Sequence, residues 1–146
     1  MHVEIEHAPA ASVQAGPRAT LSVLRAAAVL HAMAVVLQPV LAGMYLGGDV
    51  DAIGVHGGNA GLVALLALTQ AVAAIGYVWP GGGRLWPLGV SVAVFMAEVV
   101  QIGMGYSANL PVHIPLGVTI IVSQVLLTVW VLRSGAKAPR TLGRRR

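Results

Sequence analysis

Four long apolar segments dominate the sequence and limit the folds that the chain can adopt. They run from about Arg25 to Gly47, Asn59 to Trp79, Leu85 to Tyr106 and Leu110 to Leu132. At about 1.5 Å rise per residue, a helix of this length crosses a hydrocarbon core of about 30 Å. The composition agrees, since 57% of the residues are apolar, 10% are charged and the mean hydropathy is +0.80. We therefore expect an integral membrane protein.

The apolar segments are typical of helices rather than strands. They lack period-two alternation, and only helices or closed barrels satisfy all of their backbone polar groups in lipid. Because the connections are short, consecutive helices should be antiparallel neighbours, with the second and fourth helices on a diagonal. We predict an all-α, four-transmembrane-helix antiparallel bundle over residues 20–133, with helices at about 20–47, 56–79, 85–107 and 110–132.

The basic residues predict the orientation in the membrane. Arg18 and Arg25 lie near the start of the first helix, Arg84 lies between the second and third helices, and six more basic residues follow Leu132. The other two loops contain no Lys or Arg. The positive-inside rule then places both termini in the cytoplasm, in a bacterial cytoplasmic membrane. We expect residues 1–19 to be a disordered tail and residues 134–146 to be a basic tail. This distribution does not suggest nucleic-acid binding.

Two histidines occupy similar depths near the outer surface. His56 lies at the start of the second predicted helix and His113 in the first turn of the fourth. On diagonal helices their imidazoles could face each other, as the two axial ligands of a b-type haem do. The simpler interpretation is a pair of polar side chains at the membrane interface. A zinc site is less favoured, because it would need a further ligand such as Asp49 or Asp51.

The chain contains no cysteine, which excludes disulfides and thiolate ligands to a metal or haem. The residues one turn inward from the two histidines include Asn59 and Gly117, and small or aliphatic side chains there suit the edge of a macrocycle. The many glycines could equally serve close helix packing.

A second group of polar residues lies near the middle of the predicted membrane. His31 and Gln38 share a face of the first helix, and Glu98 and Gln101 share a face of the third. Ionisable groups at this depth are costly and often functional. The group could be a hydrogen-bonded clasp between helices, a proton path or a substrate site.

Three stretches resemble a known family. The segment Q-I-G-M-G-Y-S-A-N-L-P-V-H-I-P-L-G is similar to a segment of the heme A synthases, where a helix with Gln and Gly leads through a short outer loop to a haem-ligating histidine. The L-Q-P-V-L-A-G-M-Y-L-G-G stretch resembles that family's L-Q-x-x-L-G-G, and H-G-G-N-A-G-L-V-A-L-L-A-L lies where the family has its other haem histidine. Those enzymes fuse two similar four-helix bundles, and this chain resembles one of them over about residues 25–132.

The resemblance implies that His56 and His113 are axial haem ligands and that Gln101 and Gly105 form the motif of the third helix. The family's catalytic E-x-x-H-R motif is missing, because the matching stretch here is I-G-V-H-G. Haem hydroxylation is therefore not expected, and we assign no catalytic residue.

These observations predict a small b-type cytochrome or haem-handling protein with one haem b per chain near the outer face. The alternative is a non-haem assembly subunit, or a carrier of small molecules or protons, that uses the mid-membrane polar group. We expect the lipid bilayer, a quinone or a redox protein, and a second copy of the chain in a homodimer as partners. The predicted cofactor-binding residues are His56, His113, Gln101, Gly105, Gly117 and Asn59, and the predicted buried polar or proton site is His31, Gln38 and Glu98.

Overall fold

The computed structural model describes residues 18–140, and apart from its turns this part of the chain is helical and contains no strand. Its elements are α1 (Arg18–Leu46), α2 (Ala52–Val78), α3 (Trp86–Tyr106), α4 (Leu110–Leu132) and a short 3-10 helix, η1 (Ser134–Lys137). Each of the four α-helices is long and apolar enough to cross a membrane. The all-helical fold class and the apolar helices predicted from the sequence are therefore confirmed.

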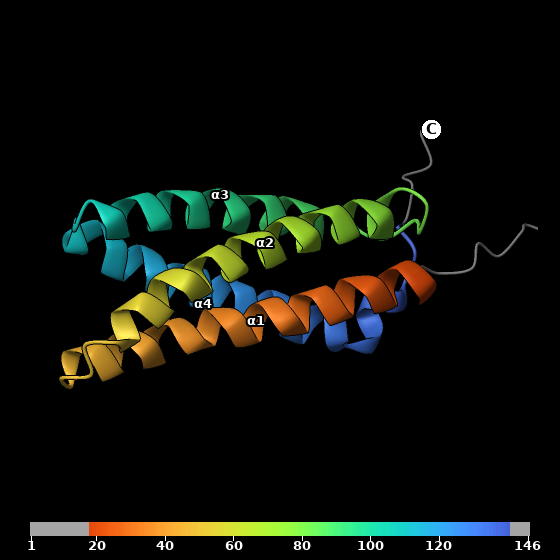
Figure 1. Ribbon diagram of the computed structural model, residues 1–146. Coiled ribbons are helices and arrows are strands. Elements are labelled where there is room, and N and C mark those ends of the chain that lie inside the picture. Colours follow the sequence, from red (N-terminus) through yellow and green to blue (C-terminus); the bar gives the residue numbers. More distant parts are fainter. Residues whose placement is uncertain (1–17, 141–146) are drawn as a thin grey trace, which may run out of the picture.

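The four helices form a ring in which each helix packs against its neighbours in sequence and α1 packs against α4. Neither α1 and α3 nor α2 and α4 have backbones in contact, so these two pairs are the diagonals. The short turns after α1, α2 and α3 make consecutive helices antiparallel (Figure 1). In Figure 1 the α1–α2 and α3–α4 pairs lie farther apart at the end that carries loops 47–51 and 107–109.

The helix boundaries differ from the predicted ones by two residues or fewer, except at the start of α2. This helix begins at Ala52 rather than near residue 56. The backbone carbonyl of Asp51 accepts hydrogen bonds from the amides of Gly54 and Val55, which closes an extra first turn. His56 therefore lies one turn inside α2 instead of at its start.

The end of the bundle where α1 begins and α4 ends lies opposite loops 47–51 and 107–109. Side chains there join segments that are distant in the sequence and close this end. The Arg25 guanidinium in α1 donates from Nε to the carbonyl of Val131 at 2.7 Å, and from Nη2 to those of Leu132 and Arg133 at 3.3 Å. The last carbonyls of a helix have no partner within it, so this contact satisfies the end of α4.

Part of the expected C-terminal tail packs against this closed end. Ala136 is fully buried, and its carbonyl accepts a hydrogen bond from the Tyr77 hydroxyl at 3.0 Å. The backbone amide of Arg140 donates to the carbonyl of Gly82 at 2.7 Å. Residues 134–140 are thus part of the packed structure. The N-terminal tail was predicted to be disordered over residues 1–19, but α1 already begins at Arg18, and residues 1–17 and 141–146 lie outside the described residues.

The α2–α3 turn offers a test of this packing. A Cβ atom on Gly83 would overlap the ring of the buried Tyr77, whereas one on Gly89 in α3 would have no neighbour within 4 Å. Overpacking of this kind typically costs about 1–3 kcal/mol. We expect Gly83→Ala to lower the midpoint of thermal unfolding in detergent by several degrees, and Gly89→Ala to leave it unchanged or slightly raised. Equal midpoints for the two variants would contradict the packing of Gly83 on Tyr77.

Candidate functional site

His56 of α2 and His113 of α4 face each other across a diagonal of the bundle. Their ring centroids are 6.2 Å apart, and the ring planes are inclined by 57°. Both residues are half-buried. The backbones of α2 and α4 are not in contact, so the two imidazoles approach each other because their side chains extend into the interior of the bundle.

Each imidazole is held through Nδ1 by a backbone carbonyl of a neighbouring helix. Nδ1 of His113 lies 2.9 Å from the carbonyl oxygen of Gln101, and Nδ1 of His56 lies 3.2 Å from that of Gln38. Nδ1 of His56 lies near both the Gln38 carbonyl, which only accepts, and the Gln38 side-chain nitrogen, which only donates, so these contacts do not select its tautomer. Nδ1 of His113 has the Gln101 carbonyl as its partner, so it carries the proton and Nε2 of His113 keeps a free electron pair. This is the arrangement in which histidines usually bind metals, with the second nitrogen oriented by a carbonyl.

Two glycines make room for this arrangement. A Cβ on Gly105 would lie 3.0 Å from Cε1 of His113, and a Cβ on Gly117 would lie 2.8 Å from Nε2 of Gln101. The absence of a side chain at Gly105 lets the His113 ring approach α3. The absence of one at Gly117 leaves space on α4 for the Gln101 amide. The predicted residues His56, His113, Gln101, Gly105 and Gly117 therefore lie together.

Two cavities meet at the histidine pair, in the half of the bundle where the hairpins diverge. The larger one, of about 350 Å³, is lined by residues of all four helices, among them Gln38, Val63, Glu98, Gln101 and Ile120. The smaller one, of about 220 Å³, is lined by residues of α2, α3 and α4, among them Gly57 and Tyr106. Both cavities include His56 and His113 in their walls.

Two residues that line the larger cavity, Glu98 and Gln101, each carry a buried acceptor atom without a partner. Oε2 of Glu98 and Oε1 of Gln101 are buried and have no hydrogen-bond partner in the described part of the protein. Glu98 is 2% exposed, so water outside the bundle does not reach it. Buried polar atoms without partners are rare because each one costs about 1–3 kcal/mol, so these two oxygens are candidates for contact with a ligand or water.

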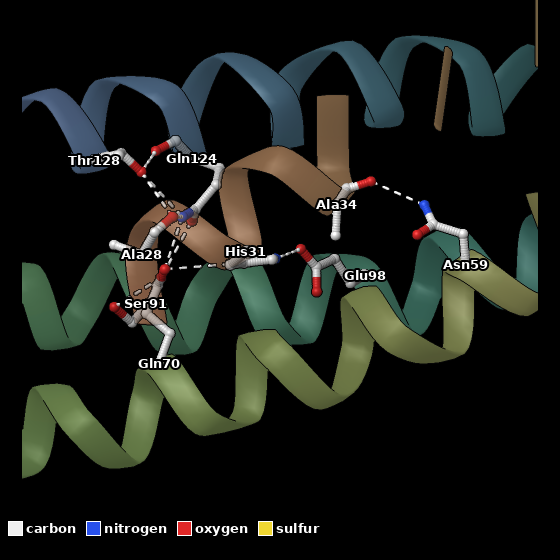
Figure 2. Close-up of polar contacts among 9 residues, drawn as sticks. All are labelled: Ala28, His31, Ala34, Asn59, Gln70, Ser91, Glu98, Gln124 and Thr128. Atoms are coloured by element: carbon white, nitrogen blue, oxygen red, sulfur yellow. Dashed lines mark hydrogen bonds and ion pairs between the residues drawn. The ribbon is translucent and has the colours of Figure 1, made fainter. Parts of the chain in front are cut away.

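The other carboxylate oxygen of Glu98 is fixed by His31 (Figure 2). Nε2 of His31 lies 2.7 Å from Oε1 of Glu98, and Nδ1 of His31 lies 3.2 Å from Oε1 of Gln70. His31 is fully buried, and it joins α1 to α3 across the second diagonal of the bundle.

The His31–Glu98 pair is one end of a network that joins all four helices. The Gln70 amide nitrogen donates to Oγ of Ser91 at 3.3 Å and to Oε1 of Gln124 at 3.1 Å. Nε2 of Gln124 and the Thr128 hydroxyl each donate to the carbonyl of Ala28 at 3.1 Å (Figure 2). Every side chain in this central network is at most 9% exposed.

Sequence reasoning assigned no partner to Gln70 or Gln124. The spacing of α2 carried a signal, because His56, Val63, Gln70 and Tyr77 recur every seven residues and all face the interior. Two predicted residues also have places that the sequence did not suggest. Asn59 donates to the carbonyl of Ala34 at 2.9 Å and lines neither cavity, so it connects α2 to α1 (Figure 2). The Gln38 side-chain amide approaches His56, with its nitrogen oriented to lie 3.0 Å from Nδ1.

The ligand set limits which metals the histidine pair could hold. In residues 18–140 no group of three or more His, Asp or Glu side chains is arranged to bind a metal ion. A zinc ion, which usually has three or four protein ligands, is therefore not favoured.

Comparison of the chain with protein-family models, with curated proteins and with solved structures gave no match. The resemblance to the heme A synthases stays a hypothesis from short motifs.

The His31–Glu98 contact can be tested by stability. Glu98→Leu removes the partner of a fully buried imidazole, which should cost about 1–3 kcal/mol and lower the thermal midpoint in detergent by several degrees. Glu98→Gln should recover most of the loss, because an amide can donate to or accept from Nε2. If the leucine variant is as stable as the unmodified protein, the contact does not support the fold.

Proposed function

We propose that this chain is a small b-type cytochrome or haem-handling protein, with one haem b held between His56 and His113. The observation that carries the proposal is the pair of opposed imidazoles, each in contact with a backbone carbonyl through Nδ1, which in His113 leaves Nε2 free to bind a metal. We place it in the bacterial cytoplasmic membrane, with the haem near the outer face.

The distances fit such a ligand set. Metal–imidazole bonds of about 2 Å on either side of one iron would put the ring centroids roughly 6 Å apart. The observed separation is 6.2 Å, and the two axial ring planes need not be parallel. A porphyrin supplies the other four nitrogen ligands, so two histidines suffice. Of the two mainly apolar cavities beside the pair, the larger, of about 350 Å³, lies within the usual range of ligand sites of about 300–1,000 Å³, and the smaller, of about 220 Å³, lies below it.

The chain's own residues have distinct parts in this proposal. His56 and His113 would bind the iron, the carbonyls of Gln38 and Gln101 would orient the rings, and Gly105 would keep the space beside His113 open. Haem supplies a one-electron redox centre when bound. If both histidines bind the iron, no position on it is left for a substrate, so electron transfer or haem handling is favoured over catalysis. A quinone or a redox protein would be the electron partner, and a homodimer stays a prediction.

Absorption spectroscopy tests the haem proposal. Protein made with ample haem should be red, with the reduced spectrum of a six-coordinate b-type haem, at about one haem per chain. His56→Ala and His113→Ala should each lose that spectrum because one axial ligand is gone. Free imidazole should restore it in His113→Gly, which shows that this variant is folded. A colourless unmodified protein, or an unchanged spectrum in His113→Ala, would overturn the proposal.

We also propose, from the distribution of the basic residues, that both termini lie in the cytoplasm. Single cysteines introduced in the loops can test this orientation. The natural chain has no cysteine, and Asp49 and Arg84 are exposed in loops at opposite ends of the bundle. We expect a membrane-impermeant maleimide to label Asp49→Cys in intact cells and to label Arg84→Cys only after the membrane is permeabilised. The reverse pattern would invert the proposed orientation.

One observation favours a second function, that of a small-molecule or proton carrier without haem. Glu98 and Gln101 line the larger cavity and each has a buried oxygen without a partner, and the His31–Glu98 pair adjoins this cavity. This function predicts that Glu98→Gln changes activity while His56→Ala has little effect, which is the opposite of what the haem proposal predicts.

A further inference from the structure

We infer that the inner part of the larger cavity binds a lipid-soluble hydroquinone, whose phenolic hydroxyl donates to the free oxygens of Glu98 and Gln101. The choice of a redox-active ligand rests on the proposed haem function, because the same cavity reaches His56 and His113. The need for a hydrogen-bond donor rests on the cavity alone.

Oε2 of Glu98 can only accept a hydrogen bond, whether the His31 ring is protonated or neutral. Oε1 of Gln70 can only accept, so Nδ1 of His31 carries a proton. Nε2 of His31 then either donates as part of an imidazolium or accepts a proton held on Oε1 of Glu98. In both cases Oε2 has no hydrogen. The second free atom, Oε1 of Gln101, is an amide oxygen and also only accepts.

The walls of the larger cavity favour a ligand that has a hydrogen-bond donor on an apolar body. Apart from Gln38, Glu98, Gln101 and the two histidines, its walls are aliphatic side chains, proline and glycine, among them Val35, Val63 and Ile120. The ionised propionates of a haem placed between the histidines only accept hydrogen bonds, so they would not satisfy the two oxygens. A second molecule with hydroxyl groups on an apolar body would satisfy them, and so avoid the cost of unpaired buried acceptors.

A ligand dissolved in the bilayer can reach the larger cavity. The wall of the larger cavity includes exposed residues of α1, Pro39, Gly43 and Leu46, and exposed residues of α4, Ile114 and Val118. The cavity thus reaches the surface of the bundle between α1 and α4, where the rim is apolar. In a membrane-spanning bundle this surface faces lipid, so a ligand that partitions into the bilayer can enter without crossing water.

The proposal predicts a preference for the reduced form of the ligand. A hydroquinone donates from its hydroxyls, whereas the corresponding quinone has only carbonyl acceptors and would place them against two further acceptors. We expect the unmodified protein in phosphatidylcholine nanodiscs to bind decyl-substituted benzohydroquinone at least tenfold more tightly than decyl-substituted benzoquinone. The measurement is anaerobic equilibrium dialysis of both forms, on haem-loaded and haem-free protein.

Variants separate the cavity from the fold. Gln101→Leu removes a free acceptor but keeps the backbone carbonyl that holds His113, so it should lose the tenfold preference and retain the haem spectrum. Glu98→Leu should lose the preference as well, and Glu98→Gln should regain part of it through its amide oxygen. Thr69→Leu is the control, since Thr69 is exposed on α2 and bonds only to its own helix.

The outcomes distinguish this inference from the proposed function. A haem spectrum without preferential hydroquinone binding overturns the inference but not the cytochrome proposal. Hydroquinone binding that is confined to haem-free protein has the same meaning. Preferential binding without any haem spectrum supports the donor site and overturns the cytochrome proposal. An unchanged preference in Gln101→Leu and Glu98→Leu would also overturn the inference.

Discussion

The rest of this structure depends on the cost of burying polar side chains inside an apolar bundle. His31, Gln70, Ser91, Glu98 and Gln124 are at most 2% exposed, so each needs a partner from another helix. A single network meets this need and draws on α1, α2, α3 and α4 at one level. Removing a member would leave others unpaired in a medium that cannot hydrate them. The network therefore fixes how the four helices are rotated against each other.

The two halves of the bundle differ as a consequence. Toward the closed end, the packed cluster around Tyr77, the Arg25 contacts and η1 leave little space between the helices. Toward the other end the hairpins diverge, and both cavities lie there with the histidine pair between them. Glu98 lies at the boundary, because one of its oxygens belongs to the network, the other has no partner, and the residue lines the larger cavity. This boundary links the structural polar groups to the proposed ligand sites.

Several features of the fold could be predicted because they depend on residue type and distance along the chain. The four apolar segments fixed the number and approximate length of the helices, and short loops implied their antiparallel order. Counting along each helix also placed His56 and His113 at one depth and His31 and Glu98 at another. The start of α2 was predicted four residues late, because the extra turn depends on backbone bonds to Asp51 that composition does not reveal.

The direction in which a side chain points was harder to predict. In a membrane protein the lipid-facing surface is as apolar as the core, so hydrophobic periodicity gives little information about helix rotation. Asn59 was expected beside a cofactor, yet it faces Ala34, and Gln70 and Gln124 had no predicted partners. By itself the sequence determined the helices, their order and the depth of each polar group, since these follow from local composition. Only the tertiary structure decided which polar groups meet, which oxygens stay free and where the cavities lie, because these depend on helix rotation and tilt.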